Sequence, residues 1–438
     1  MNSALSVNDC FANSAALLSH DAAVATLRAR LAPVTGVERV SLWEASDRVV
    51  AEAVDAPLPV PFHTNAAVDG YAFAADEAAN GPDGTRAIVG RAAAGHPHPL
   101  AHIPGSAIRI LTGAVMPQGT DTVAMQEDVT LSDDGRFVRL PSNLKRGANV
   151  RQAGEDIARG TRVFSAGHLL RPQDLAALAS MGVQHVDCRK RLKVAILATG
   201  DEVRPAGHMP LAMGEVYDAN SPMLAALARL AGANVTMLGI LRDDRAIVES
   251  TLRDAARDFD VVLTSGGASR GEEDHIAAVL DKIGTRHFWQ IAVKPGRPMM
   301  FGQVGRSIVV GLPGNPVAVF VCFLMYVHPM LRRLGGAPWP EPRRFFLPAA
   351  FEVPGRKLGR REFWRGVLHS GPDGLSVEKF PRDGSGLITG LRVADGLIDI
   401  AEDLSEVRRG DRVAFIPFSE FGITPQSLAS QSGDDLAS

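Results

Sequence analysis

Residues 192–200 read LKVAILATG, a continuous apolar run that ends in glycine and opens a regular alternation of segment types. A helix-like segment, SPMLAALARLAGA (221–233), follows it, and the strand-like NVTMLGIL (234–241) comes next. Two more pairs of a helix-like and a strand-like segment follow. A further strand-like segment and a long apolar helix then continue the pattern to residue 334. Apolar strands alternating with helices are typical of a mostly parallel sheet covered on both faces. The sequence therefore predicts an α/β domain over residues 191–336.

The segments on either side of this domain are shorter and richer in Gly and Pro breaks, which is typical of small β domains. We expect an inserted β domain over 58–151 and a C-terminal β domain over 337–425. Residues 1–57 and 152–190 would together form a discontinuous N-terminal linker domain. The small, polar tail 426–438 is predicted to be disordered.

The composition narrows the class of protein. The 438 residues are 46% hydrophobic and 22% charged with a net charge of −3, which is typical of a globular cytoplasmic chain and not of a nucleic-acid or membrane-surface binder. Three cysteines lie far apart, so the pattern favours neither a disulfide framework nor a zinc finger. The most apolar run, VAVFVCFLMYV (317–327), is too short at eleven residues to span a bilayer and is expected to be a buried helix.

Polar residues follow the expected strands at one sheet edge, where ligands of open α/β sheets bind. Gly266 and Gly267, flanked by hydroxyl side chains, expose backbone N–H groups that suit a phosphate. Lys294 and Arg297 add positive charge. The carboxylates that we expect at the same edge would repel an anion unless a hard cation lay between them; they are Glu202, Asp243 and Asp274. The combination predicts a phosphorylated substrate handled with Mg²⁺.

Each of these features also has an ordinary structural interpretation. Ser-Gly-Gly is a common turn, Asp243-Asp244 can cap the next helix, and Lys294 can be a solvated charge. Their concurrence at one edge favours a functional cleft. A P-loop and a dinucleotide-binding Gly motif are both absent from the sequence. Four histidines form a loose cluster that we interpret as surface loop and not as a zinc site: His63, His96, His98 and His102.

Nine short motifs occur in an order that identifies a family. They are NAAVDGYA (65–72), TGA (112–114), GEDI (154–157), TGDE (199–202), YDAN (217–220), RDD (242–244), SGGASRGEED (265–274), KPGRP (294–298) and GLPGNP (311–316). Over about residues 20–420 the chain resembles the molybdopterin molybdenumtransferases, bacterial molybdenum insertases that are related to the C-terminal part of gephyrin.

The resemblance implies the final step of molybdenum cofactor synthesis, a transferase reaction. Molybdate would be inserted into adenylylated molybdopterin with release of AMP, in a reaction that depends on Mg²⁺. It also implies a homodimer whose active sites are shared between subunits, with the N-terminal linker domain serving in dimerisation. The adenylyltransferase of the same pathway is a further candidate partner.

The resemblance also assigns roles to residues at matching positions. Those implied to be catalytic are Asp69, Asp156, Glu202, Asp243, Asp274 and Lys294, with Glu202, Asp243 and Asp274 also holding the metal. Those implied to bind substrate are Thr112, Arg151, Thr199, Ser265, Gly266, Gly267, Ser269, Arg297, Pro313, Asn315, Pro316, Arg365 and Ser385.

Five positions depart from the family pattern. Gln290 stands where relatives can carry a lysine, and Arg297 replaces the commoner lysine, which keeps the charge but changes its geometry. The other three departures are Val68, Arg270 and His275. These changes bear on substrate contacts more than on the reaction itself.

Two alternative functions are open at this point. One is adenylyl transfer from ATP to molybdopterin, a reaction of a related stand-alone α/β domain. The other is a non-catalytic binding or scaffold protein built on the same fold. The additional N- and C-terminal domains disfavour the first alternative, and the intact acidic and glycine-rich loops disfavour the second.

Overall fold

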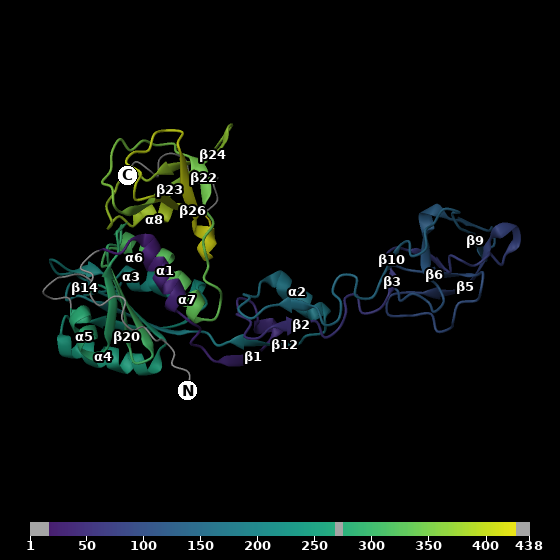
Figure 1. The fold of residues 1–438 in the computed structure, drawn as a ribbon, viewed down its shortest axis with the longest axis horizontal. Coiled ribbons are helices and arrows are strands. Elements are labelled where there is room, and N and C mark those ends of the chain that lie inside the picture. The colour runs from purple at the N-terminus through teal and green to yellow at the C-terminus, as the bar shows by residue number, and fades with distance from the viewer. Residues whose placement is uncertain (1–16, 268–274, 426–438) are drawn as a thin grey trace. The chain divides into compact units, whose positions relative to one another are not determined.

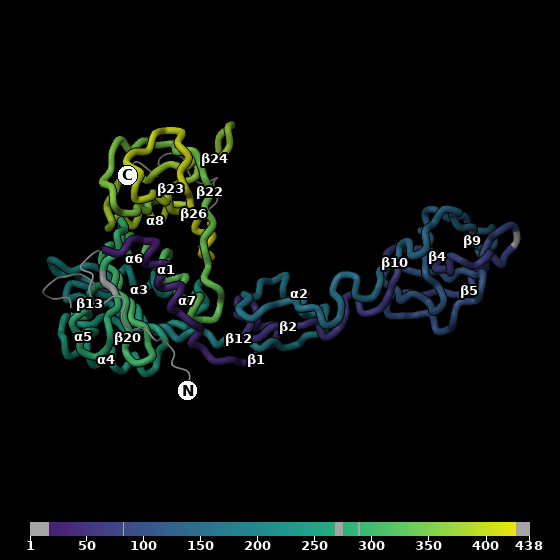
Figure 2. The backbone as a smooth tube through the Cα atoms, in the orientation of Figure 1, coloured from purple at the N-terminus to yellow at the C-terminus, as the bar shows by residue number. Residues whose placement is uncertain are grey.

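The structure is a computed structural model that describes residues 17–267 and 275–425 (Figure 1). The chain divides into two compact units. Unit 1 comprises residues 1–38, 47–49 and 189–438, and unit 2 comprises residues 39–46 and 50–188. Figure 2 traces the backbone of the chain, coloured by residue number from purple near the N-terminus to yellow near the C-terminus.

A six-stranded sheet forms the centre of the α/β part of unit 1, with the order β16-β13-β17-β21-β20-β18. The first four strands in this order run parallel; they are β16 (Asn234–Leu241), β13 (Lys193–Thr199), β17 (Val261–Ser265) and β21 (Ser307–Leu312). Antiparallel pairing adds β20 (Pro298–Val304) and β18 (Thr285–Gln290). The expected mostly parallel sheet is therefore confirmed, with two antiparallel pairings at one end.

Helices cover both faces of this sheet because successive strand residues point to opposite sides. Ile196 packs in one apolar cluster with α3 (Asn220–Leu230), and its neighbour Leu197 packs in another with α4 (Arg245–Asp258). The first cluster also contains residues of α1 (His20–Arg30) and α6 (Pro316–Cys322), and the second contains residues of α5 (His275–Ile283). All four parallel strands thus deliver their carboxyl ends to one edge between the helix layers.

The apolar helix ends at residue 334, as the sequence pattern predicts. α6 continues through η4 (Phe323–Val327) into α7 (His328–Leu334), so the helical run Pro316–Leu334 has 19 residues. By length and composition it could cross a membrane, but 89% of its most apolar window is buried inside the protein. The apolar run 317–327 lies inside this helix, and its burial confirms the expected core helix.

A second sheet in unit 1 forms the C-terminal domain. It has the order β19-β23-β25-β26-β22, where β23 (Arg361–Gly371) also pairs with β24. The other members are β25 (Gly396–Ile400), β26 (Arg412–Pro417), β22 (Phe345–Pro348) and β24 (Gly374–Lys379). The edge strand β19 (Val293–Lys294) comes from the α/β segment, and it pairs with β23 so that Lys294 lies opposite Glu362. This pairing fixes one loop of the α/β domain against the C-terminal domain.

Unit 2 is built mainly from short strands. Its six-stranded sheet, of order β7-β4-β6-β5-β9-β8, consists of β4 (Gly70–Phe73), β5 (Arg86–Ala92), β6 (Ala107–Ile110), β7 (Thr122–Met125), β8 (Thr130–Leu131) and β9 (Phe137–Arg139). Two-residue strands β3 (Asn65–Ala66) and β10 (Val150–Arg151) form an antiparallel pair. A separate core surrounds Leu178 of α2 (Pro172–Ser180). Unit 2 thus contains the β-rich structure expected of the N-terminal half.

Candidate active site

The loop after β17 approaches the end of β13 closely. Gly266 and Gly267 have φ angles of 89° and 70°, in the left-handed region that favours glycine. A Cβ on Gly266 would lie 2.9 Å from the Thr199 carbonyl oxygen, and one on Gly267 would lie 2.5 Å from Cγ1 of Ile276. Only glycine fits at both positions, so the backbone of this loop packs directly against Thr199.

Asn220 joins two loops at the same edge. The residue is 8% exposed, and Nδ2 donates to Oγ of Ser265 at 2.8 Å and to the carbonyl oxygen of Gly314 at 2.7 Å. The loop after β17 is therefore tied to the GLPGNP loop after β21. The YDAN motif contained this residue, but its role was missed because both partners are remote in sequence.

The acidic residues at this edge belong to the loops after β13 and β16. Asp201 N donates to the Asp243 carboxylate at 3.1 Å, and Asp243 N donates to the Asp201 carboxylate at 3.2 Å. His275 Nε2 lies 3.0 Å from the Asp243 carbonyl oxygen, which links α5 to this loop. Glu202, one residue beyond Asp201, is exposed to solvent. The predicted residues Asp243 and Glu202 thus lie on neighbouring loops.

The metal prediction depends partly on residues that the structure leaves undescribed. Asp274 and Ser269 lie outside the described residues, as does the departure at Arg270. Within residues 17–267 and 275–425, there is no group of three or more His, Cys, Asp or Glu side chains that could hold a metal ion. The oxygen donors of Glu202 and Asp243 are nevertheless of the kind that Mg²⁺ prefers.

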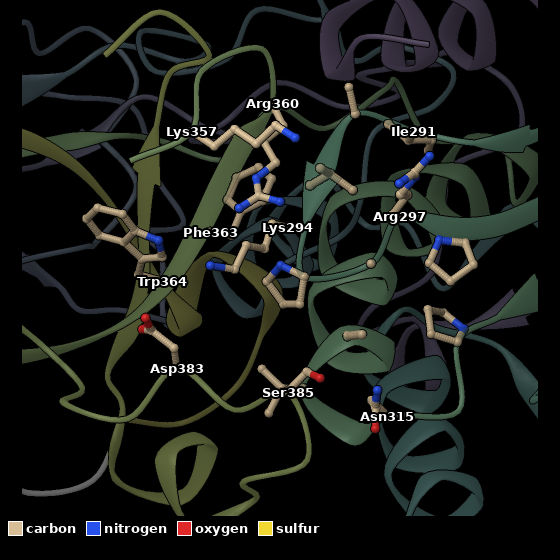
Figure 3. A pocket seen from close by; sticks show the side chains of 18 of the residues that line it. Ile291, Lys294, Arg297, Asn315, Lys357, Arg360, Phe363, Trp364, Asp383 and Ser385 are labelled. Atoms are coloured by element: carbon tan, nitrogen blue, oxygen red, sulfur yellow. The ribbon is translucent and has the colours of Figure 1, made fainter. Parts of the chain in front are cut away.

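A pocket of about 410 Å³ lies between the α/β part and the C-terminal domain of unit 1 (Figure 3). Of the described residues that line it, six carry positive charge and one carries negative charge. The cations are Lys294, Arg297, Lys357, Arg360, Arg365 and Lys379, and the carboxylate is Asp383. This excess of positive charge indicates a pocket for an anion.

Six of the predicted site residues line this anion pocket. They are Lys294, Arg297, Pro313, Asn315, Arg365 and Ser385, while Pro316 follows as the first residue of α6. The prediction missed Lys357, Arg360, Lys379 and Asp383. These four come from the C-terminal domain, where charged residues are common and no short motif marks them.

Arg365 uses its guanidinium within the C-terminal domain. It donates to the carbonyl oxygen of Leu387 at 3.0 Å and to that of Arg382, and its charged group stands 4.7 Å from the ring centre of Phe380. Burial lowers the pKa of Arg365. Arg365 therefore holds the loop that brings Ser385 to the pocket, in addition to lining the pocket itself.

The side chains at positions 290 and 297, both of which depart from the family pattern, contact each other. The guanidinium of Arg297 donates to Oε1 of Gln290 at 3.3 Å. A lysine at position 290 would lack this acceptor and would place a second positive charge beside Arg297. The two substitutions are thus structurally coupled, and the glutamine orients the remaining cation.

Four predicted residues lie in unit 2. Asp69 accepts two hydrogen bonds from Thr112, one from its backbone N–H and one from its hydroxyl, both at 2.7 Å. These bonds, the backbone bond foremost, lower the pKa of Asp69. Arg151 pairs with Asn65 in β10 and β3, and Asp156 N donates to the Val60 carbonyl oxygen at 3.1 Å. The structure brings Asp69 and Thr112 together, and the roles of all four stay predictions.

The fold and the pocket define a class of multidomain α/β protein with a positively charged pocket between its α/β part and its C-terminal domain. Three family domains match in order: "MoeA N-terminal region (domain I and II)" over residues 18–182, "Probable molybdopterin binding domain" over 195–333, and "MoeA C-terminal region (domain IV)" over 347–418. The chain belongs to the molybdopterin molybdenumtransferase family, as its motifs indicated.

Relatives match along nearly the whole chain. Molybdopterin molybdenumtransferase of Haemophilus influenzae is 37% identical over 407 residues, covering 92% of this chain and 99% of the relative. Molybdopterin molybdenumtransferase 2 of Mycobacterium tuberculosis is 33% identical over 405 residues, covering 90% and 97%. The solved structure of molybdopterin biosynthesis moeA protein from Pyrococcus horikoshii OT3 has a TM-score of 0.79 at 28% identity, covering 92% of this chain and all of that one.

Proposed function

We propose that this protein inserts molybdate into adenylylated molybdopterin and releases AMP. The observation that carries the proposal is the anion pocket, in which six cations and one carboxylate adjoin the GLPGNP loop of a domain of molybdopterin-binding type. Molybdate and the phosphates of the pterin substrate are both anionic, so they suit this charge. The names of the relatives support the same reaction.

The described residues suggest how the reaction is assisted. Lys294, Arg297 and Arg360 would attract and orient molybdate through charge-assisted hydrogen bonds. The backbone N–H groups of Gly266 and Gly267 would hold the phosphate end of the pterin substrate at the strand edge. The protein's contribution is thus mainly positioning and electrostatic stabilisation.

A divalent cation completes this proposal. Glu202 and Asp243, with Asp274, would hold Mg²⁺, which would neutralise charge that develops on the phosphate during AMP release. Chelation with EDTA is expected to stop AMP release, and added Mg²⁺ is expected to restore it. AMP release that persists at full rate in EDTA would remove the metal from the proposal.

The proposal also covers the oligomeric state of the protein, its localisation and the enzyme that supplies its substrate. We propose a cytoplasmic homodimer in which Asp69, Thr112, Arg151 and Asp156 of unit 2 serve the active site of the partner chain. The adenylyltransferase that makes the pterin substrate would be its supplier. Light scattering on the purified chain tests the dimer, since a mass near that of one chain would contradict it.

The deciding experiment follows AMP release from adenylylated molybdopterin with and without molybdate. Release is expected only with molybdate, and Lys294→Ala is expected to slow it strongly because this change removes a cation from the pocket. Lys193→Ala is the matched control, since Lys193 begins β13 at the end opposite Thr199. Consumption of ATP without molybdate would instead indicate adenylyl transfer, and failure to bind the pterin would indicate a scaffold protein.

A further inference from the structure

Glu362 is a buried acid directly beside the anion pocket. Its residue is 2% exposed, and it lies on β23 opposite Lys294 of β19. One carboxylate oxygen accepts a hydrogen bond from Trp364 Nε1 at 2.9 Å and lies 3.6 Å from Nζ of Lys294. The other accepts from Nε of Arg360 at 3.0 Å. Glu362 therefore contacts three residues that line the pocket, although it does not line the pocket itself.

The surroundings of Glu362 keep its carboxyl group ionised. Burial would by itself raise the pKa of Glu362, but hydrogen bonds from Trp364 and Arg360 and the positive charge of Lys294 outweigh burial and lower it. Arg356 adds another guanidinium, with Nε 3.7 Å from Oε1. A single negative charge is thus shared among three cations that would otherwise repel one another.

Figure 3 shows where two of these cations end in the pocket. Lys294 enters from the α/β side and Arg360 from the C-terminal domain, so they come from different parts of the chain. Both side chains are long and flexible, and holding them in one arrangement costs conformational entropy. A buried carboxylate that contacts both restricts them before the anion arrives, which lowers the cost of binding.

We propose that Glu362 is a positioning residue that holds Lys294 and Arg360 in the arrangement that binds a tetrahedral oxyanion. The proposal rests on the proposed function, because molybdate is the oxyanion expected in this pocket. It predicts the direction in which removal of the Glu362 carboxylate changes the affinity for the anion. A nearby carboxylate that acted only through its charge would weaken anion binding, so its removal would strengthen binding. A carboxylate that positions the cations has the opposite effect, and its removal weakens binding.

The test measures molybdate binding to the full chain by isothermal titration calorimetry. Glu362→Gln keeps the size of the side chain and removes its charge. We expect about tenfold weaker binding, which corresponds to about 1.4 kcal/mol. Glu362→Asp keeps the charge on a side chain shorter by one methylene, and it is expected to restore part of the affinity. Sulfate, which is also a tetrahedral dianion, is expected to show the same order of affinities among the variants.

A second buried carboxylate provides the matched control. Asp399 on β25 is 5% exposed and accepts hydrogen bonds from Arg344 and Arg361, but it does not line the anion pocket. Asp399→Asn therefore removes the same charge from the same domain. Both neutral variants are expected to unfold at a lower temperature than the wild type, while only Glu362→Gln is expected to lose molybdate affinity.

The outcomes separate this proposal from the proposed function. Unchanged or tighter molybdate binding by Glu362→Gln, in a wild type that binds molybdate and releases AMP, would overturn the positioning role alone. Equal losses of affinity in Glu362→Gln and Asp399→Asn would also overturn it, because they would indicate general loosening of the domain. If Glu362→Gln does not fold, the molybdate affinity of Glu362→Asp is compared with that of the wild type and of Asp399→Asn in the same way. Unchanged or tighter binding by Glu362→Asp would then overturn the positioning role. A wild type that neither binds molybdate nor releases AMP would overturn both proposals.

Discussion

Replacing Asn220 by aspartate tests whether one side chain holds together two loops of the candidate active site. The change keeps the shape of the side chain but replaces the Nδ2 donor with an acceptor. Ser265 can adapt, because its hydroxyl can turn and donate to the new carboxylate. The carbonyl oxygen of Gly314 cannot donate, so Asn220→Asp would set two acceptors against each other where a 2.7 Å hydrogen bond now exists.

The expected cost follows from the burial of this bond. Losing one hydrogen bond at a position that is 8% exposed costs about 1 kcal/mol, and the unpaired acceptors add a similar amount. Before the cost of burying the carboxylate charge is counted, a total of about 2 kcal/mol corresponds to a decrease of about 3 °C in the unfolding midpoint of a unit as large as unit 1. Because the loops carry Ser265 and Asn315, we also expect the KM for adenylylated molybdopterin to rise about tenfold.

The assay compares thermal unfolding and steady-state AMP release in Asn220→Asp and in Asn234→Asp. Asn234 is exposed at the start of β16, so the same chemical change there is expected to alter stability by less than about 0.5 kcal/mol. Acidification supplies a second signature, since a protonated carboxyl regains a donor and the defect of Asn220→Asp should then diminish. Equal midpoints and equal KM values for the two variants would refute the role given to Asn220.

Three further predictions concern other parts of the molecule. Gln290→Lys and Arg297→Lys should change molybdate affinity non-additively, by about 0.5–1 kcal/mol in a double-mutant cycle, since the two side chains are hydrogen-bonded; additive effects would contradict the coupling. Burial lowers the pKa of His20 from 6.5 to about 4, so its contribution of about 3 kcal/mol is complete above pH 6.5 and is lost as the pH falls towards 4. His20→Gln, which can still bond the Tyr326 hydroxyl, should flatten the dependence of unfolding free energy on pH in that range, and an unchanged slope would argue against it. Asp69→Asn can keep an acceptor for Thr112, so AMP release should fall at least tenfold while the unfolding midpoint of unit 2 stays constant; full activity would remove Asp69 from the catalytic set.

The α/β part of the fold was predictable because local pattern and tertiary environment agree in it. Val194 to Ala198 are apolar without interruption, and the structure buries both faces of that strand. Because ligands of open α/β sheets bind at the carboxyl ends of the strands, the sequence alone placed Thr199, Ser265 and Asn315 at one edge of the sheet. Glycines at 266 and 267 carried a further local signal, because their backbone conformation and close packing both require that residue.

The pairing of β19 with β23 could not be predicted from the sequence. Val293 and Lys294 form a strand of only two residues, which is too short for any periodicity, and their partner lies about 70 positions further along the chain. Cross-strand register depends on the packing of the whole domain, and a slip of one residue would turn Glu362 away from Lys294. The residues that contact the pocket cations, such as Glu362, therefore could not be predicted from the sequence, even though Lys294 itself was.

The charge of the pocket shows why composition gave so little indication of function. The chain has a net charge of −3, with 46 basic and 49 acidic side chains, so its average favours no anionic ligand. Within the pocket, however, the described lining residues include six cations and one carboxylate, drawn from segments as far apart as Lys294 and Lys379. Such a concentration of like charge is unfavourable unless an acid such as Glu362 is buried behind it. The local field that selects the ligand and the buried acid that stabilises this field are therefore produced together by the fold, and neither can be read from the totals.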